Sequence, residues 1–238
     1  MNTWRLLRFD VRFQVRHRFY SVYLVIIACY IGLLHTLPDT MTDKALVLLT
    51  FSDPSALGLL FAGGIILLER AQGVWDSLFA TPIRLGEYLL AKCLSLGLLS
   101  LSAAFAIHVP VNGLPASTFY YTTGVVLTSC FFTLLGIAAA LASRSINGFL
   151  IRSQAYALVF AAPLLGYLDM YRTPLYKLLP TEGSLTLIGG AVHRITPGEG
   201  AYAISALLLW IAVAAFLVRQ GLHAAVRQTD GGRVHEKI

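Results

Sequence analysis

The sequence predicts an all-α membrane protein, a single domain of six transmembrane helices over residues 1–238. Two observations predict this class. The chain is 57% hydrophobic and 13% charged, whereas soluble domains carry about 25% charged residues. Six apolar runs follow one another, and most reach the roughly 20 residues that a spanning helix needs. Because the charges gather between these runs, we expect several helices that cross a bilayer.

Residues 1–18 precede the first apolar run and are rich in arginine. The arginines from Arg5 to Arg16 recur every three or four residues, which predicts an interfacial helix on an anionic membrane surface. The stretch from Phe9 to Val15 also alternates apolar and polar residues, as a strand would. We prefer the helix, because an unpaired strand at a bilayer leaves its backbone polar groups without partners.

The six apolar runs set the predicted spans. They cover residues 19–37, 45–68, 88–109, 119–142, 154–171 and 197–218. The fifth is short and contains Pro163, so we expect a kink or tilt there. The sixth opens with Thr196, Pro197 and Glu199 in the order of a capping box with proline in the first turn.

The positive charges predict the orientation. Most of the 18 Lys and Arg residues fall on one side of the six spans, and the other side holds Lys44, Arg172, Lys177 and Arg194. Cytoplasmic loops carry an excess of Lys and Arg. Both termini and residues 69–92 are therefore expected in the cytoplasm, with the chain in the inner (plasma) membrane. This bias also explains the net charge of +6 without nucleic-acid binding.

The stretch 69–92 is polar and lies between the second and third spans. Pro82 should break a helix that begins before it, and Thr81 can cap a second one. It contains three acidic residues, Glu69, Asp76 and Glu87, and three basic residues, Arg70, Arg84 and Lys92. This balance argues against a basic patch for lipid or nucleic acid and favours docking to another protein.

Residues 172–199 form a long outer loop that is not hydrophilic. Its apolar pieces are far too short to span, and prolines and Gly183 interrupt them. Short re-entrant helices are expected, since irregular backbone at membrane depth must be buried in protein or line a cavity. Glu182 is a candidate gate residue of this loop.

Asp53 is the one carboxylate within the second apolar run. An N-cap with Pro54 as the first helical residue is the preferred interpretation. The alternative is a site in the substrate pathway, for a cationic substrate or for protons.

Several other residues are expected to have structural roles. Gly58 with Ala62, and Gly136 with Ala140, have spacing for close helix packing inside one chain. His108 is expected at a solvated span end. The cysteines are taken as packing residues. An aromatic belt at the outer interface would comprise Tyr120, Tyr121, Tyr167, Tyr171 and Tyr202.

The order of residues in 69–92 resembles the signature of the type-2 permeases of ATP-binding-cassette (ABC) transporters. The matching positions are Glu69, Arg70, Gly73, Leu78, Thr81, Pro82, Glu87 and Lys92. Residues 174–183, followed by Leu185, Leu187 and Gly189, are similar to the small fluoroquinolone-export permeases.

The resemblance implies the permease half of an exporter for hydrophobic or amphipathic cargo. Two permease chains would pair, and each would dock on a separate ABC ATPase that binds ATP and Mg²⁺, so no cofactor is expected on this chain. Residues 69–87 would be the cytoplasmic coupling segment. The implied coupling residues are those eight positions together with Trp75 and Phe79, which could instead be interfacial anchors. The rival classes are a passive channel and an intramembrane enzyme.

Overall fold

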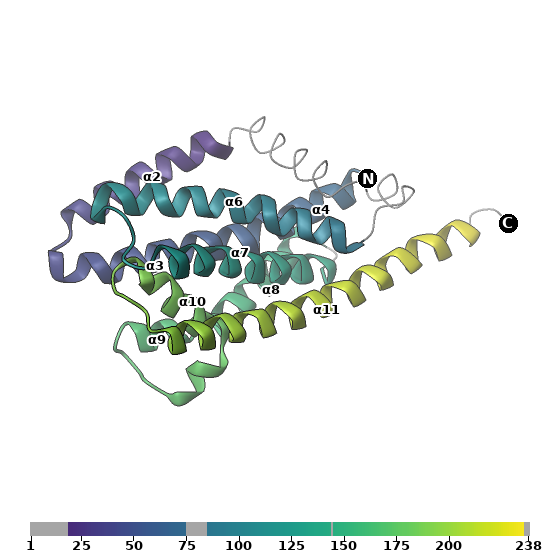
Figure 1. The fold of residues 1–238 in the computed structure, drawn as a ribbon. Helices are drawn as coiled ribbons and strands as arrows, with labels where there is room; N and C mark the ends of the chain where they lie inside the picture. Colours follow the sequence, from purple (N-terminus) through teal and green to yellow (C-terminus); the bar gives the residue numbers. More distant parts are fainter. Residues whose placement is uncertain (1–18, 75–84, 144, 236–238) are drawn as a thin grey trace.

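The computed structural model describes residues 19–74, 85–143 and 145–235 of the chain, and every element in these ranges is helical. The prediction of an all-α protein is therefore confirmed. The helices form one bundle, in which most run roughly parallel or antiparallel to a common axis (Figure 1). The predicted interfacial helix of residues 1–18 lies outside the described residues.

The first half of the bundle contains α2 (Phe19–Thr36), a long bent helix and α6 (Leu85–Asn112). The bent helix is built from α3 (Asp39–Ala56), the π-helix η1 (Leu57–Ala62) and α4 (Gly63–Ala71). Proline has no N–H to donate and crowds the preceding turn. Pro54 lies in the last turn of α3, so α3 lacks one backbone hydrogen bond shortly before η1 begins.

The second half contains α7 (Thr118–Leu141), the broken pair α8 (Ile146–Phe160) and α9 (Pro163–Tyr167), and the long α11 (Pro197–His235). Between α9 and α11 lie three short elements, the 3₁₀-helix η2 (Pro174–Leu178), α10 (Pro180–Ile188) and the 3₁₀ turn η3 (Gly189–Ala191). The helix break at Pro163 confirms the expected kink, although α8 begins eight residues before the predicted start.

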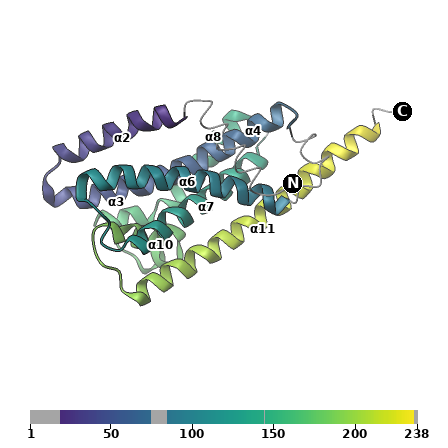
Figure 2. The same ribbon diagram turned by 45° about the horizontal axis from the view of Figure 1, so that its top comes forward.

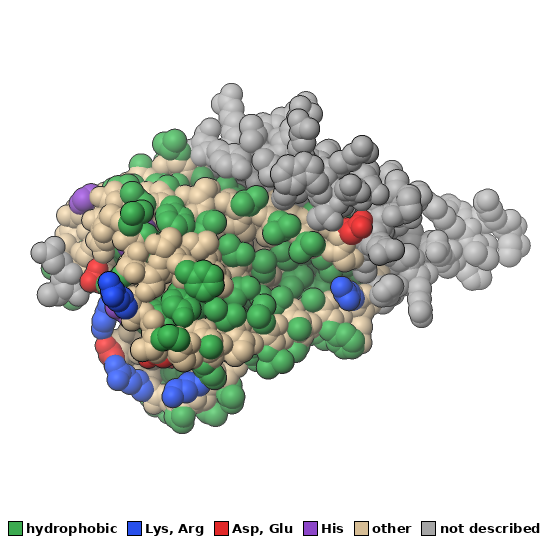
Figure 3. All heavy atoms as spheres, viewed as in Figure 1, with side chains coloured by type: hydrophobic (Ala, Val, Ile, Leu, Met, Phe, Trp, Pro, Cys, Tyr) green, Lys and Arg blue, Asp and Glu red, His purple; other side chains and the backbone are tan. Residues whose placement is uncertain are grey.

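The two ends of the bundle differ. At one end, here the α10 end, lie the α2–α3 turn, the α6–α7 connection and the elements from α9 to the start of α11 (Figures 1 and 2). At the other, here the Glu69 end, lie the end of α4, the start of α6, the α7–α8 turn and the C-terminal part of α11. Hydrophobic side chains cover the middle of the face in Figure 3, and charged ones gather at the α10 end.

Four helical stretches are long and apolar enough to cross a bilayer within the described residues, namely Met41–Ala71, Gly86–Asn112, Thr118–Leu141 and Pro197–Leu222. They correspond to the second, third, fourth and sixth predicted spans. The first predicted span corresponds to the 18 residues of α2. The fifth predicted span corresponds to the interrupted pair α8 and α9.

Helix α7 is the centre of the core. It packs against α6, α10, α11 and the α3–η1–α4 helix. Two glycines permit its contact with η1: a Cβ on Gly136 would lie 2.4 Å from the carbonyl oxygen of Leu59, and one on Gly58 would lie 2.6 Å from the Thr133 nitrogen. The predicted use of these small residues for packing inside one chain is confirmed.

The start of α11 has the predicted capping box. Glu199 accepts hydrogen bonds from the Thr196 backbone N–H at 3.1 Å and the Thr196 hydroxyl at 2.7 Å, and its own N–H donates to that hydroxyl oxygen at 3.4 Å. These bonds satisfy donors that a helix N-terminus otherwise leaves free.

Two positions expected at the outer interface are instead buried. His108 and Tyr121 are each 0% exposed, and their ring centroids lie 5.4 Å apart. The α6 helix continues through Pro110 to Asn112, which places His108 a full turn inside the bundle. Tyr121 turns inward and donates to the Ala104 carbonyl at 2.9 Å, so both predictions were wrong.

The α7–η1 contact predicts that Gly136→Ala destabilises the protein. An added methyl group must push against backbone oxygens, and overpacking of this kind costs about 1–3 kcal/mol. We expect the melting temperature of the detergent-purified chain, followed by circular dichroism, to fall by several degrees.

Gly64→Ala is the matched control, since a Cβ there has no neighbour within 4 Å and alanine favours a helix by up to about 1 kcal/mol. Its melting temperature should equal or exceed that of the original chain. Equal melting temperatures for the Gly64 and Gly136 variants would contradict the proposed contact.

Candidate functional site

The end of α4 is a tight turn at the start of the coupling segment. The Gln72 N–H donates to the Leu68 carbonyl at 3.0 Å, and the Gly73 N–H donates to the Arg70 carbonyl at 3.3 Å. Gly73 has φ of +66°, a conformation that L-residues with a side chain rarely adopt and that commonly ends helices. The glycine at this position of the signature therefore ends α4 and redirects the chain away from it.

A buried ionic cluster joins the last turn of α4 to the first turns of α6. The Lys92 ammonium donates to Glu69 Oε1 at 2.8 Å, and the Tyr88 hydroxyl donates to Glu69 Oε2. The side chains of Lys92 and Glu69 are 5% and 17% exposed. The Lys92 ammonium also lies 5.4 Å from the centroid of the Tyr88 ring, within the range of a cation–π contact. Both carboxylate oxygens and the ammonium are thus partnered where little water reaches them.

The cluster closes the polypeptide loop that contains the coupling segment. Glu69 stands at its beginning and Lys92 a little beyond its end, so the ion pair fixes the two ends relative to each other. Removal of one partner from a buried ion pair costs about 3–5 kcal/mol, because the other charge is left without compensation. The ion pair therefore ties the last turn of α4 to the first turns of α6.

The ten predicted coupling residues fall into four groups. Glu69 and Lys92 meet inside the bundle, and Arg70 and Gly73 are exposed at the α4 turn. Glu87 lies partly exposed in the first turn of α6. The remaining five, Trp75, Leu78, Phe79, Thr81 and Pro82, lie outside the described residues.

The start of α6 also lies close to α11. A Cβ on Gly86 would lie 3.4 Å from a guanidinium nitrogen of Arg219. In the sequence, Arg219 directly follows the sixth predicted span. Its side chain therefore lies at the same end of the bundle as the coupling segment.

Asp53 lies within α3 and does not cap a helix, because α3 runs from Asp39 through Pro54 to Ala56. The N-cap prediction was wrong: proline is tolerated here inside the helix, which continues as η1. The side chain is 7% exposed, and Oδ1 accepts a hydrogen bond from the Tyr23 hydroxyl of α2 at 3.1 Å. Its second oxygen, Oδ2, is buried and has no hydrogen-bond partner among the described residues. Asp53 therefore joins α2 to α3 with half of its hydrogen-bonding capacity unused.

Glu182 belongs to a different region. It lies in the first turn of α10 and faces a cavity of about 990 Å³ at the α10 end. The α10 helix packs against α3, α7 and α11, so this part of the loop 172–199 is embedded in the bundle. The structure thus joins Glu69 to Lys92 and leaves Asp53 and Glu182 as separate sites.

Sequence reasoning missed Tyr88, the third member of the ionic cluster. The signal was present, because Tyr88 and Lys92 are four residues apart and such pairs share one face of a helix. No group of three or more His, Cys, Asp or Glu side chains placed to hold a metal occurs in the described ranges.

Comparison with known proteins finds relatives of this chain. Two curated relatives, both named fluoroquinolones export permease protein, come from Mycobacterium tuberculosis strains CDC 1551 / Oshkosh and ATCC 25618 / H37Rv. Each is 27% identical to this chain over 201 residues, which is 83% of this chain and 85% of the relative.

The model of the fluoroquinolones export permease protein family matches residues 2–227. This range includes α4, the coupling segment, α6 and the loop that carries α10. The chain therefore belongs to the fluoroquinolones export permease protein family.

Proposed function

We propose that this chain is the permease subunit of an ABC exporter in the inner membrane, driven by a separately encoded ATPase. The single observation that carries the proposal is the buried Glu69–Lys92–Tyr88 cluster. It anchors a polar segment at the end of the bundle opposite α10. A segment held in this way is suited to receive a mechanical input from a partner protein.

The chain needs a partner for the nucleotide. Its sequence has no G-x-x-x-x-G-K-[ST] loop, the motif whose backbone N–H groups cradle phosphates in many ATPases. In the proposed exporter, two permease chains pair and each docks on one ATPase. The Glu69 end is cytoplasmic and the α10 end faces outward, with α2 as the first span and α8–α9 as the fifth.

The proposed mechanism is an alternating-access cycle. Closure of the two ATPases on ATP pushes the coupling segments together, and the cluster passes this movement to α4 and α6. Packed helices respond by rigid-body movement, since close-packed cores deform little. A cargo site between the chains then opens alternately to the two sides.

The cargo proposed is hydrophobic or amphipathic, such as a drug, an antibiotic or a lipid-like molecule. The names of the two mycobacterial relatives support an export role, and the apolar spans suit a cargo that enters from the membrane. A passive channel would instead need a continuous polar path along several helices.

Docking is tested with a Trp75→Ala/Phe79→Ala double variant. A tagged chain should copurify with a Walker-containing ATPase in roughly equal amount, and we expect the double variant to lose most of that ATPase. The reason is that large aromatic residues dominate the energetics of many protein interfaces. The measurement is the ratio of the two proteins after purification.

Leu24→Ala is the matched control for loss of an apolar side chain, because Leu24 is 69% exposed on α2 and is not one of residues 69–87. It should copurify with the ATPase as the original chain does. A double variant that retains the full amount of ATPase would remove these two residues from the interface, and a chain that always purifies alone would refute the exporter proposal.

Asp53→Asn tests the proposed role of Asp53 in the substrate pathway. Asparagine has nearly the same shape and can still accept from Tyr23, but it cannot carry the negative charge. We expect ATP-driven export by proteoliposomes that contain the permease and ATPase to fall at least tenfold, with ATPase copurification unchanged.

Tyr23→Phe is the control, since it removes the hydrogen bond and keeps the carboxylate. It should retain most of the export activity. Export by Asp53→Asn at the original rate would show that the charge of Asp53 has no part in transport.

A further inference from the structure

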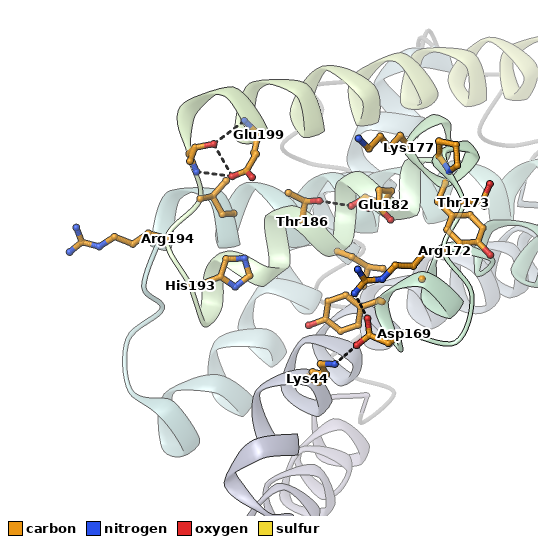
Figure 4. Close-up of a pocket in the computed structure, with 17 residues that line it drawn as sticks. Lys44, Asp169, Arg172, Thr173, Lys177, Glu182, Thr186, His193, Arg194 and Glu199 are labelled. Carbon is orange, nitrogen blue, oxygen red and sulfur yellow. Dashed lines mark hydrogen bonds and ion pairs between the residues drawn. The ribbon is translucent and has the colours of Figure 1, made fainter.

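The cavity at the α10 end is bounded by charged, polar and aromatic side chains from four parts of the chain. Lys44 comes from α3, Tyr167 and Asp169 from α9 and the turn after it, Glu182 from α10, and Glu199 from α11 (Figure 4). Its volume of about 990 Å³ is at the upper end of the range for sites that hold small organic molecules, about 300–1,000 Å³. The size therefore fits a drug-sized ligand.

Two of the three acids in this cavity are already partnered. Asp169 accepts from Lys44 at 2.7 Å and from Arg172, and these cations hold the pKa of its carboxyl below the usual range. Glu199 is engaged in the cap of α11 with Thr196. The same contacts occupy Lys44 and Arg172, and Arg194 points away from the other labelled side chains (Figure 4).

Glu182 is the exception. Its backbone carbonyl accepts from the Thr186 hydroxyl at 2.9 Å, but no hydrogen bond or ion pair to its carboxylate occurs within the described part of the chain. The residue is partly buried, and desolvation raises the pKa of its carboxyl although the positive charge of Lys177 opposes this. A partly desolvated carboxylate that faces an open cavity gains most from an incoming cation.

The surroundings of Glu182 suit an organic cation. Tyr167, Tyr176 and Leu185 also line the cavity. A Cβ on Gly166 would lie 3.0 Å from the ring of Tyr176, so this ring is packed against the α9 backbone. Aromatic faces attract ammonium groups and bury apolar surface at the same time.

We propose that the cavity at the α10 end is a binding site for cationic amphiphiles, in which the Glu182 carboxylate pairs with the ammonium group and Tyr167, Tyr176 and Leu185 contact the apolar part. Its place on the outer face rests on the proposed function, whereas the binding itself requires neither ATPase nor transport. Lys177 weakens the site by repulsion and so sets its affinity.

The test uses ethidium, an aromatic permanent cation, and phenanthridine, its neutral parent ring system. The full chain is placed in nanodiscs of neutral phosphatidylcholine, and binding is followed by fluorescence titration after subtraction of empty discs. We expect saturable binding of one ethidium per chain, with affinity at least tenfold lower in Glu182→Gln. Phenanthridine binding should be the same in both proteins.

Two further variants separate a binding role from a structural one. Asp169→Asn removes an acid of the same cavity that is paired with Lys44 and Arg172, and asparagine tolerates the φ of 61° at this position; ethidium affinity should fall by a clearly smaller factor than in Glu182→Gln. Lys177→Met removes the repelling charge, and the affinity should rise about two- to fivefold, as expected for a charge screened by water. If these substitutions acted only by destabilising α10, Lys177→Met would not bind ethidium more tightly than the original chain.

The affinity should also depend on pH. Because the pKa of Glu182 is raised, the carboxylate takes up a proton at a higher pH than an ordinary glutamate, so ethidium affinity should fall between pH 8 and pH 5. Apart from the tyrosines, the other titratable and charged groups that line the cavity are His193, Lys44, Arg172, Lys177, Arg194, Asp169 and Glu199. Their hydrogen bonds hold the pKa of the Asp169 and Glu199 carboxyls below the usual range. A Glu182→Gln/His193→Gln variant should lose the pH dependence.

The proposal is overturned if ethidium binds no better than to empty discs, or if Glu182→Gln and Asp169→Asn weaken binding equally. Loss of ATPase copurification with intact ethidium binding would count against the proposed function alone.

Discussion

The carboxylate of Glu69, held by Lys92 and Tyr88, is the interaction on which the proposed coupling depends. It joins Glu69 to Lys92, which are 23 positions apart. It therefore holds together the two ends of the loop that contains the coupling segment. An ion pair at the protein surface contributes little, because water screens it and the side chains lose freedom. At 5% and 17% exposure, this pair is shielded, and each partner becomes costly to remove. The segment is thus anchored rigidly at its base, while Arg70 and Gly73 remain exposed at the α4 turn.

A second constraint lies in the core between η1 and α7. The glycines Gly58 and Gly136 bring the two backbones so close that no side chain fits between them. A π-helix is rare and often marks a functional position, and here it separates Asp53 from the ionic cluster on α4. In the proposed mechanism, a movement of α4 would reach Asp53 along the chain through η1, which packs closely against α7.

Much of the fold was predictable because the bilayer imposes simple rules on length and polarity. The capping box at Thr196, the break at Pro163 and the packing of Gly136 follow from local chemistry. The errors arose where tertiary packing overrode local signals. Asp53 with Pro54 resembled a helix start, but the helix continues through proline, and His108 is drawn inward because α6 extends past Pro110. Of the site, the sequence identified Glu69 and Lys92 but not that they pair, since contact across 23 residues depends on how α4 and α6 pack.

The most direct test of the account is a double-mutant cycle on the ionic cluster, measured as ATP-driven export by proteoliposomes that contain the permease and its ATPase. Four proteins are compared, the original chain, Glu69→Gln, Lys92→Met and the double variant. If the buried pair transmits the movement, each single variant leaves an uncompensated partner, and the double variant exports much faster than the product of the two losses predicts, with a coupling energy of about 2 kcal/mol or more. Losses that simply add, within about 0.5 kcal/mol, would contradict the claim that this pair couples the segment to the spans.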